Sequence, residues 1–473
     1  MKSSNGLENS ITSDKLHESC GVFGIFLDDA TRDAALLVYD GLLALQHRGQ
    51  ESAGIAAVKD HTIEFRKGMG LAADVFNPET IGQLKGPAAV GHVRYSTAGS
   101  STIENAQPFV SRFKLGSIAV AHNGTLTNAD VVRELLEDSG VGFTSSSDSE
   151  VIVNLIAKNY RKGLEKALTD TIKFIKGSYA LAILTDDALV GARDPNGIRP
   201  LCLGKLAGGW ILASESCAID AVGGEFVRDI EPGEVIIIGQ DQVLSFSFSE
   251  KTRRAICAFE YVYFARPDSI IDTTDVYGAR VRAGEILGRE SAVSADLVIG
   301  VPDSGIPAAI GYGRATNTPF GLGIVKNKYV ARTFIAPDQI KRERAVYVKH
   351  NVIKSEMKGK RVVLIDDSIV RGTTSKRLVS ILKAAGAKEV HIRICSPPVR
   401  CPCYFGIDTP HRKDLISNGS SIPELCKSLG ADSLSFISIE GLLESLKATA
   451  EKSYCLGCFT GEYPIPVAGE SGN

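Results

Sequence analysis

Short runs of alternating hydrophobic and polar residues dominate the first half of the chain, and glycine, asparagine and aspartate separate them. Such alternation is typical of β-strands, and we expect strands at residues 22–26, 52–57, 88–93, 117–121, 180–184 and 209–213. Two longer stretches, residues 34–45 and 148–168, are predicted helices. This half is therefore predicted to consist of sheets covered by helices.

From about residue 258 onward, the pattern changes to an alternation of longer strands and helices. Residues 296–300 and 362–365 form short apolar runs, as expected of interior strands in a parallel sheet. Helices are predicted at residues 278–291, 375–385 and 439–450. The pattern predicts a doubly wound α/β arrangement in this half.

The chain has 473 residues, which exceeds a single ordinary core and indicates two domains of about 200 to 250 residues each. We place these domains at residues 20–250 and 251–473. Residues 1–19 are polar and have no apolar period, so we expect a flexible leader there.

The formal net charge is −2 and 23% of the residues are charged, so no overall basic field attracts nucleic acid or a membrane surface. No apolar run approaches the roughly 20 residues that span a bilayer. The N-terminus has no apolar segment behind a basic start, so export is not indicated. We expect a cytoplasmic protein with no nucleic-acid or membrane partner.

Two adjacent carboxylates, Asp366 and Asp367, directly follow the apolar run at residues 362–365. Ligands bind at the carboxyl edge of open α/β sheets, and neighbouring carboxylates repel each other unless hydroxyls or a cation such as Mg²⁺ share the site. Residues 371–374 then supply backbone N–H groups, two hydroxyls and a glycine before a predicted helix, which suits a phosphate monoester. An Asx-type turn that caps the helix is the structural alternative.

This segment resembles the substrate loop of the type I phosphoribosyltransferases. The resemblance implies that the acid pair contacts the ribose hydroxyls of phosphoribosylpyrophosphate (PRPP) and that the following loop holds the 5′-phosphate. It also implies that residues 301–305, a common turn sequence on their own, face the pyrophosphate, and that Ser304, Asp366 and Asp367 surround Mg²⁺. The expected PRPP-binding residues are Asp303, Ser304, Lys326, Asp366, Asp367, Ser368, Arg371, Gly372, Thr373 and Thr374.

Cys20 stands immediately ahead of an apolar strand, where a thiol by itself can be a simple packing residue. Four further segments accompany it, at residues 46–50, 91–97, 121–125 and 145–148. The set resembles the N-terminal-nucleophile glutamine amidotransferases. Together the two resemblances imply an αββα N-terminal-nucleophile hydrolase sandwich, classed as α+β, followed by an α/β type I phosphoribosyltransferase domain.

The amidotransferase resemblance implies that self-cleavage removes residues 1–19 and exposes Cys20 as the first residue. The new α-amine has an ordinary pKa of ~7.7 to 8.0, so it can relay the thiol proton, whereas an uncleaved amide nitrogen cannot. The preceding residue is Ser19, where many leader-bearing members of this family carry an acidic residue. We therefore expect cleavage at this position, at a rate that the sequence leaves open.

The same resemblance assigns the remaining roles in the glutamine site. The side chain of Asn123 and the N–H of Gly124 form the oxyanion hole, while Arg94 and Asp148 bind the α-carboxylate and α-ammonium groups of glutamine. For the last two residues, a salt bridge at the surface or between domains is the alternative. The histidines near these motifs are interpreted as structural hydrogen-bonding residues, because the terminal amine already supplies the base; they are His47, His92 and His122.

Ten cysteines in a large chain that is expected to be cytoplasmic favour metal binding or catalysis over disulfides. Cys455 and Cys458 have a spacing that suits Zn²⁺, an iron–sulfur cluster or redox chemistry. Cys257 and Cys403 complete four thiols if the fold brings them together, although Cys401 lies only two residues from Cys403. Four others are expected to be packing residues: Cys202, Cys217, Cys395 and Cys426.

These cysteines and the closing residues 458–464 narrow the resemblance to the family of glutamine PRPP amidotransferases, in the branch with a processed leader and a [4Fe–4S] cluster. The resemblance implies cluster ligands at Cys257, Cys403, Cys455 and Cys458. It implies that ammonia released from glutamine attacks PRPP, giving 5-phosphoribosylamine, glutamate and pyrophosphate, the first committed step of de novo purine biosynthesis. Feedback inhibition by purine nucleotides and a homotetramer are also implied.

Ammonia must not escape into water, so a closed apolar path between the two sites is required. Residues 261–267 and 326–337 are the candidates for its walls and gate, and an ordinary solvated loop is the alternative for the second segment. A structural Zn²⁺ is the alternative occupant of the four thiols.

Two other functions compete with this assignment. The first is an amidotransferase joined to a sugar-isomerase type of acceptor domain, which the acid pair and residues 372–374 disfavour. The second is a PRPP-sensing regulator without catalysis. Against the regulator stand the presence of Cys20, Asn123 and Asp148 and the lack of an obvious basic DNA-binding domain.

Overall fold

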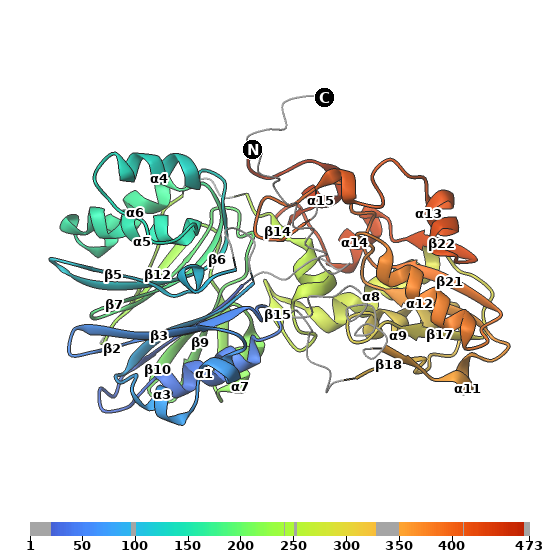
Figure 1. Ribbon diagram of the computed structural model, residues 1–473, viewed down its shortest axis with the longest axis horizontal. Coiled ribbons are helices and arrows are strands. Elements are labelled where there is room, and N and C mark those ends of the chain that lie inside the picture. The colour runs from blue at the N-terminus through green and yellow to red at the C-terminus, as the bar shows by residue number, and fades with distance from the viewer. Residues whose placement is uncertain are drawn as a thin grey trace, which may run out of the picture.

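The computed structural model describes residues 20–95, 101–240, 242–249, 253–327, 350–409 and 411–467. These residues form two parts that lie side by side, a sandwich of two β-sheets and an α/β part (Figure 1). No helix in the described ranges is long and apolar enough to cross a membrane.

The first sheet of the sandwich has seven antiparallel strands in the order β11-β9-β10-β1-β4-β2-β3. Its strands are β1 (Gly21–Leu27), β2 (Ser52–Lys59), β3 (Thr62–Met69), β4 (Ala88–Arg94), β9 (Cys202–Leu206), β10 (Gly209–Ala213) and β11 (Glu225–Asp229). The second sheet has six antiparallel strands in the order β13-β12-β8-β7-β6-β5. Its strands are β5 (Phe109–Phe113), β6 (Gly116–Leu126), β7 (Gly177–Thr185), β8 (Leu189–Arg193), β12 (Glu234–Ile238) and β13 (Val243–Ser247).

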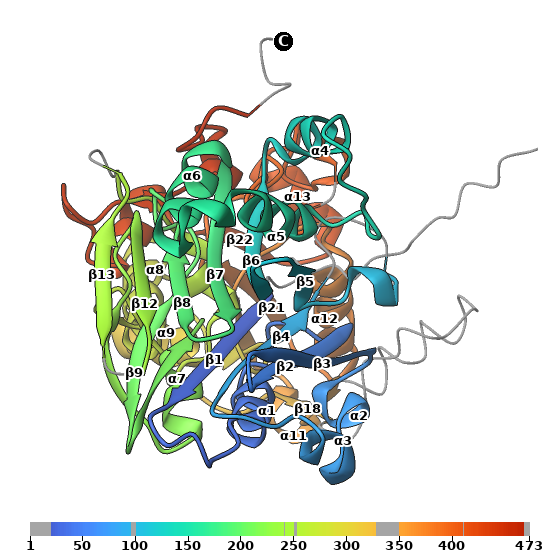
Figure 2. The same ribbon diagram turned by 90° about the vertical axis from the view of Figure 1, so that its left-hand side faces the viewer.

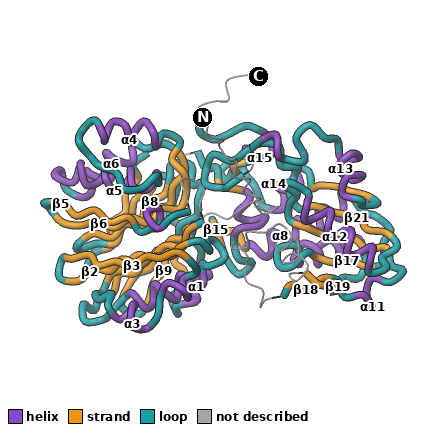
Figure 3. The backbone as a smooth tube through the Cα atoms, viewed as in Figure 1, coloured by secondary structure: helices purple, strands orange, loops and turns teal. Residues whose placement is uncertain are grey.

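Helices cover the outer face of each sheet, so the sandwich has four layers (Figures 1 and 3). The first sheet carries α1 (Ala35–Ala44), α2 (Ala72–Val75), α3 (Pro78–Gly82) and α7 (Ser216–Ala221), and the second carries α4 (Ala129–Glu137), α5 (Asp148–Asn159), η2 (Tyr160–Lys162) and α6 (Leu164–Phe174). The short turn η1 (Ile103–Asn105) lies ahead of β5 and contacts β3. Strand β1 shows how the layers are held together. Phe23 and Ile25 pack in the core beneath α1, whereas Val22 and Phe26 pack between the two sheets. The predicted strands and the αββα layering are therefore present in the structure.

The helix predicted at residues 148–168 is wrong in its extent. The chain instead forms α5, the short turn η2 and α6, and the break falls at Gly163, whose φ is +86°. That backbone conformation lies outside the right-handed helical region and is readily adopted by glycine. The helix predicted at residues 439–450 is likewise shorter, because α14 (Ile439–Ser445) ends before Lys447, whose φ is +54°.

The second part is built on a parallel sheet in the order β17-β20-β21-β22. The strands are β17 (Leu297–Gly300), β20 (Arg361–Asp366), β21 (Glu389–Ile394) and β22 (Ser433–Phe436), and the helices are α8 (Val276–Glu290), α9 (Ile306–Thr316), α11 (Lys354–Met357), α12 (Thr373–Ala384), α13 (Ile422–Leu429), α14 and α15 (Gly457–Thr460). Along β20, Val363 and Ile365 pack into the core on one face, while Val362 and Leu364 pack into the core on the other. Burial on both faces explains the uninterrupted apolar run and confirms the interior strand predicted there.

Short elements complete the second part, and some of them lie between the two parts (Figures 1 and 2). They are the strand pairs β14 (Ile256–Cys257) with β23 (Tyr454–Cys455), β15 (Ile270–Ile271) with β16 (Thr274–Asp275) and β18 (Ile324–Lys326) with β19 (His350–Val352), one turn of π-helix, η3 (Glu260–Phe264), and the 3₁₀ turn η4 (Arg412–Asp414). The side chains of η3 are almost all buried. The segment from β14 to η3 therefore forms much of the contact between the sandwich and the α/β part.

Candidate active sites

Cys20 lies at the start of β1, beside the carboxyl end of β4. Gly21 pairs with Val93 across these strands, which brings Cys20 next to Arg94. The thiol donates to the carbonyl oxygen of Tyr95 at 3.5 Å and is only 7% exposed. Burial raises the pKa of the Cys20 thiol, so this thiol needs a nearby base before it can react as a thiolate.

Two charged side chains from opposite layers converge on this thiol. Arg94 is the last residue of β4, and Asp148 is the first residue of α5. Burial is the main cause of the raised pKa of the Cys20 thiol, with the charge of Arg94 opposing the rise and that of Asp148 adding to it. Asp148 Oδ2 accepts a hydrogen bond from the N–H of Leu126 at 2.9 Å. Both charged groups are buried beside Cys20, which does not fit the alternative of a surface salt bridge.

Asn123 and Gly124 lie side by side on β6. Both polar atoms of the Asn123 amide are buried and have no hydrogen-bond partner among the described residues. A buried amide without partners is unfavourable by about 1 to 3 kcal/mol, so its place is better explained by a substrate group that it binds. Gly124 has a φ of +148°, and a Cβ at this position would lie 2.1 Å from the carbonyl oxygen of Ser178. The backbone at this point therefore requires glycine.

The histidines of the sandwich act as links between strands. His92 Nε2 on β4 lies 3.1 Å from the carbonyl oxygen of His122 on β6, and His122 Nδ1 lies 3.0 Å from Ser149 Oγ. Burial lowers the pKa of His92 to about 3 and lowers that of His122 as well. His47 Nε2 contacts Glu215 Oε1 at 2.7 Å. These contacts agree with the structural role predicted for all three rings, and they align the end of β4 with the start of the Asn123 segment.

The acid pair lies where β20 ends, next to the end of β17. Gly300 pairs with Ile365 across these strands, so Asp366, Asp367 and the turn at residues 301–305 meet at one edge of the sheet. Ser304 Oγ donates to Asp367 Oδ2, and Ser368 Oγ donates to Asp367 Oδ1 at 2.7 Å. The two carboxylates are each 2% exposed. The structure thus brings together the three residues predicted to share Mg²⁺.

The predicted phosphate loop precedes α12. Gly372 is the N-cap residue of this helix, with a φ of +81°, and has no side chain that could cap it. Thr373 and Thr374 form the first turn, so their backbone N–H groups lie at the positive end of the helix. At the other side of the sheet edge, Lys326 Nζ pairs with Asp303 Oδ2 at 2.8 Å in an exposed position. The arrangement offers separate places for a 5′-phosphate and a pyrophosphate.

No set of three or more His, Cys, Asp or Glu side chains in the described ranges is arranged to hold a metal ion. Mg²⁺ characteristically takes only one or two protein carboxylates and fills its shell with substrate phosphates and water. Asp366 and Asp367, buried next to hydroxyl groups, therefore fit such an ion in the company of its substrate.

The four cysteines predicted as ligands lie close together although they are far apart in the sequence. Cys257 on β14 pairs directly with Cys455 on β23, and Cys458 follows in α15. Burial raises the pKa of Cys257 to about 12, Arg199 opposes the rise, and the charge of Cys403 adds to it. Burial also raises the pKa of Cys458, and Cys257, Cys455 and Cys403 all contribute further.

A cluster of four irons spreads its thiolate ligands more widely than a single ion does, so these mutually interacting thiols fit an iron–sulfur cluster. The N–H of Phe405 donates to Cys403 Sγ at 3.3 Å, a contact that stabilises a ligating sulfur. Cys401 is buried nearby, and a Cβ on Gly461 would lie 3.4 Å from its sulfur. The charge of Cys403 acts on the thiols of Cys257, Cys455 and Cys458, so Cys403 lies within reach of the other three.

Four fully buried charged residues lie where the two parts meet, and the sequence prediction did not single them out: Arg48, Arg199, Glu215 and Glu260. Arg48 donates to Glu215 at 2.6 Å and to Glu260 at 2.8 and 2.9 Å, and Arg199 donates to Glu260 at 3.0 Å. Burial alone would raise the pKa of Glu260, but Arg48 and Arg199 lower it below its usual value. Two sequence signals belong to this network: Arg48 lies in the segment at residues 46–50, and Glu260 is an isolated acid in the apolar run at residues 255–264.

Arg280 of α8 connects η3 to the acid pair. Its guanidinium donates to the carbonyl oxygen of Tyr261 at 2.7 Å and to that of Ala265 at 2.8 Å. Burial lowers the pKa of Arg280, and the charge of Asp367 opposes this. The first candidate segment for an ammonia path, residues 261–267, therefore lies between the two sites. The second, residues 326–337, falls outside the described residues from position 328 onward.

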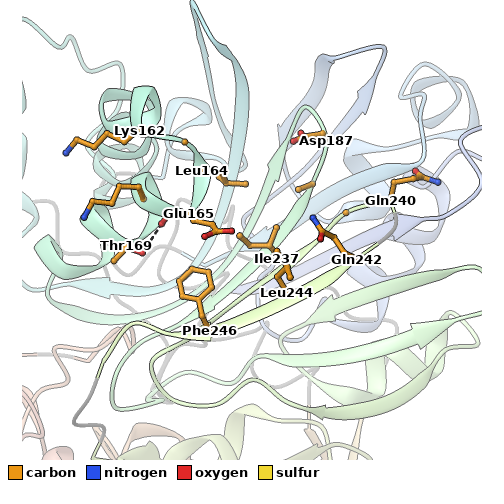
Figure 4. Close-up of a pocket in the computed structure, with 14 residues that line it drawn as sticks. Lys162, Leu164, Glu165, Thr169, Asp187, Ile237, Gln240, Gln242, Leu244 and Phe246 are labelled. Carbon is orange, nitrogen blue, oxygen red and sulfur yellow. Dashed lines mark hydrogen bonds between the residues drawn. The ribbon is translucent and has the colours of Figure 1, made fainter.

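A cavity of about 1050 Å³ opens elsewhere, between the start of α6 and strands β12 and β13 (Figure 4). Its lining includes Leu164, Ile237 and Phe246 together with Lys162 and Asp187. None of the residues predicted for either site lines it. This cavity therefore lies apart from the predicted sites.

Comparisons with known proteins match both parts. The family described as the glutamine amidotransferase domain matches residues 92–221. An amidophosphoribosyltransferase of Archaeoglobus fulgidus is 51% identical over 95% of this chain and 99% of its own length. That of Bacillus subtilis is 47% identical over 96% of this chain and 95% of its own length.

Among solved structures, the glutamine phosphoribosylpyrophosphate amidotransferase from B. subtilis complexed with ADP and GMP covers 95% of this chain and 98% of its own, with 46% identity and a TM-score of 0.89. This similarity confirms the predicted fold class, an N-terminal-nucleophile amidotransferase sandwich followed by a phosphoribosyltransferase domain. With such identity over nearly the whole length of both sequences, the chain belongs to the amidophosphoribosyltransferase family.

Proposed function

We propose that this protein is a glutamine-dependent amidophosphoribosyltransferase that releases ammonia from glutamine at Cys20 and adds it to PRPP. The observation that carries this proposal is the buried amide of Asn123, which has no hydrogen-bond partner in the described part of the chain and lies in the same sandwich as Cys20, Arg94 and Asp148. The products are 5-phosphoribosylamine, glutamate and pyrophosphate, and the reaction begins de novo purine biosynthesis.

In the glutamine site, Arg94 binds the α-carboxylate of glutamine and Asp148 binds its α-ammonium group. The thiol of Cys20 passes its proton to the freed α-amine and attacks the side-chain amide carbon. The amide of Asn123 and the N–H of Gly124 stabilise the negative oxygen of the tetrahedral intermediate. The α-amine then returns the proton to the departing nitrogen, which leaves as ammonia, and water releases glutamate from the thioester.

The α-amine exists only after removal of residues 1–19, so we include a processed leader in the proposal. It is supported by the buried thiol, whose raised pKa demands a base, and by the neutral hydrogen-bonding roles of His92 and His122. Intact mass spectrometry of active protein should show a chain that begins at Cys20. A protein that retains Met1 and still turns over glutamine at the full rate would contradict leader removal.

In the second site, the acid pair binds the ribose hydroxyls of PRPP and residues 371–374 bind its 5′-phosphate through backbone N–H groups and hydroxyls. Asp303, Ser304 and Lys326 lie on the pyrophosphate side. Asp366, Asp367 and Ser304 would hold Mg²⁺, which when bound neutralises charge on the departing pyrophosphate. Ammonia attacks C1 of the ribose as the bond from C1 to pyrophosphate breaks.

The path between the sites follows residues 261–267 in this proposal. Glu260, at the start of η3, is bonded to Arg48, and Arg48 Nε donates to the carbonyl oxygen of Cys20 at 3.1 Å. The end of the same segment is bonded to Arg280, beside Asp367. The mostly buried residues 260–265 thus reach from the contacts of the nucleophile to those of the acid pair, which supports direct transfer of ammonia without release into water.

For the four thiols we propose a [4Fe–4S] cluster held by Cys257, Cys403, Cys455 and Cys458. Protein purified without oxygen should be brown and contain about four irons per chain. Four thiols that interact with one another, with an N–H donor on one of them, support this prediction. Stoichiometric zinc without iron, measured by elemental analysis of the same preparation, would show that the thiols hold Zn²⁺ instead.

Further parts of the proposal concern organisation and control. We divide the chain into a leader at residues 1–19, an amidotransferase domain at 20–250 and a phosphoribosyltransferase domain at 251–473, supported by the change from antiparallel to parallel sheets. The solved B. subtilis relative is complexed with ADP and GMP, which supports inhibition of this protein by purine nucleotides. A homotetramer in the cytoplasm completes the proposal.

The direct test of function is a PRPP consumption assay with glutamine on protein purified without oxygen. We expect pyrophosphate and glutamate to appear in equal amounts. Glutamate should form only slowly without PRPP, and pyrophosphate only slowly without glutamine. Glutamine hydrolysis that is unaffected by PRPP, with no pyrophosphate formed, would point to an amidotransferase with a different acceptor.

A further inference from the structure

The loop that carries Cys403 packs directly on the segment assigned to the oxyanion hole. Gly406 in this loop has a φ of +93°, and a Cβ at this position would lie 3.1 Å from the Cα of Gly124 and 3.2 Å from its carbonyl carbon. A distance of that size is tighter than an ordinary contact between carbon atoms. The absence of a side chain at position 406 therefore lets a loop of the second part rest against the backbone of β6 in the first.

The carbonyl oxygen of Phe405 anchors this contact. It accepts hydrogen bonds from Ser178 Oγ at 2.9 Å and from Arg199 Nε and Nη2 at 2.8 and 2.6 Å. Ser178 Oγ in turn accepts from the N–H of Thr125, the residue after Gly124, at 3.2 Å. One backbone carbonyl thus connects the loop to the strand that presents Asn123 and Gly124.

Arg199 extends the connection to the nucleophile. Its Nη1 donates to Glu260 Oε1 at 3.0 Å, Glu260 binds Arg48, and Arg48 Nε donates to the carbonyl oxygen of Cys20 at 3.1 Å. All three charged side chains are fully buried. Removal of one partner from such a network leaves a buried charge unpaired, which is strongly unfavourable. The network therefore holds Cys20 and the Phe405 carbonyl in a defined relation.

Phe405 and Arg199 also contact the segments that carry the thiols. The N–H of Phe405 donates to Cys403 Sγ at 3.3 Å while its carbonyl group accepts from Arg199. The N–H of Cys257 donates to the carbonyl oxygen of Ile198, the residue before Arg199, at 3.1 Å. Arg199 is thus placed between two of the thiols and the glutamine site.

We infer that Phe405, Gly406 and Arg199 are positioning residues for glutamine chemistry, and that they set Cys20 and the Asn123–Gly124 strand against the loop of Cys403. This inference rests on the proposed function and adds a role for the cysteine loop within it. Disorder in the loop impairs attack on glutamine, because misplacement of reacting groups by about 1 Å lowers rates roughly 100-fold. Synthesis from ammonia does not use this contact and continues.

The test is Gly406→Ala, in which a methyl group pushes against Gly124. We expect kcat with glutamine to fall about 10- to 100-fold, with KM for glutamine changed less than about twofold, since Arg94 and Asp148 are untouched. Labelling of Cys20 by a diazoketone analogue of glutamine, followed by mass spectrometry, should slow by a similar factor without any need for PRPP. Synthesis from ammonium ions and the iron content should match those of the unchanged protein.

Gly223→Ala is the matched control, because Gly223 also has a positive φ, +74°, but faces open space at the surface. Ser178→Ala provides a second approach that adds no bulk and should lower kcat with glutamine and Cys20 labelling in the same way. If Gly406→Ala does not fold, the test rests on Ser178→Ala, and unchanged Cys20 labelling in that variant overturns the inference.

The inference is overturned if Cys20 labelling in Gly406→Ala equals that in Gly223→Ala. It is also overturned if KM alone rises, or if synthesis from ammonia falls together with glutamine use in protein that keeps its iron. Failure of the proposed function has a different signature, because the unchanged protein would then form no pyrophosphate from PRPP with either nitrogen donor.

Discussion

Cys20→Ser should abolish the use of glutamine, with a decrease of at least about 1000-fold in glutamine-dependent pyrophosphate release. A hydroxyl is far less acidic than a thiol, and the buried position already disfavours ionisation of Cys20. Synthesis from ammonium ions at high pH should stay near that of the unchanged protein, because the acid pair lies in the other part of the molecule. Both activities are measured as pyrophosphate release, once with glutamine and once with ammonium ions.

Cys202→Ser is the matched control for this substitution. Cys202 is also a buried thiol of the first sheet, and its sulfur contacts the carbonyl oxygen of Ala213 at 3.3 Å, much as Cys20 contacts a carbonyl oxygen. We expect both activities to remain within about twofold in this variant, since surface and packing changes away from the site act mainly on stability. Loss of both activities in folded Cys20→Ser would contradict separate sites for glutamine and PRPP.

Asp367→Asn should produce the opposite pattern. Synthesis should fall about 100- to 1000-fold with either nitrogen source, because the amide removes a negative charge from the site that we propose binds ribose hydroxyls and Mg²⁺. Asp367 accepts hydrogen bonds from Ser304 and Ser368, so the change also disturbs the pyrophosphate side. Basal hydrolysis of glutamine, measured as glutamate release without PRPP, should be kept.

Asp296→Asn is the control at the opposite end of the same strands. Asp296 is exposed and pairs with Arg361 at 2.9 Å, ahead of β17, and an exposed ion pair of this kind contributes only about 0 to 1 kcal/mol. Its activities should be unchanged. Full synthesis from ammonium ions in Asp367→Asn would contradict a role for the acid pair in the PRPP site.

The two variants are most informative as a pair. Cys20→Ser should retain synthesis from ammonia without glutamine hydrolysis, and Asp367→Asn should retain glutamine hydrolysis without synthesis. Mixing the two inactive proteins should not restore glutamine-dependent synthesis, because the mostly buried segment from Glu260 to Ala265 joins both sites within one chain. Restoration by mixing would instead indicate that ammonia passes through solvent.

Local chemistry made much of this structure predictable. The buried strand ending in Asp366 and Asp367 was recognisable because burial on both faces of a parallel sheet leaves an uninterrupted apolar run. The break between α5 and α6 was missed because a single glycine does not by itself end a helix, and only the backbone at Gly163 shows that it does so here.

The sequence by itself determined the two-part architecture and the residue types of both sites, since periodicity and turn chemistry act over a few neighbouring residues. Only the tertiary structure decided which of these residues meet. The approach of Cys257 to Cys455 depends on pairing across about 200 residues, and the contact of Gly406 with Gly124 depends on how the two parts dock. Burial of Arg48, Arg199 and Glu260 likewise depends on docking, because a charge becomes costly, and therefore specific for its partner, only once water has been excluded from around it.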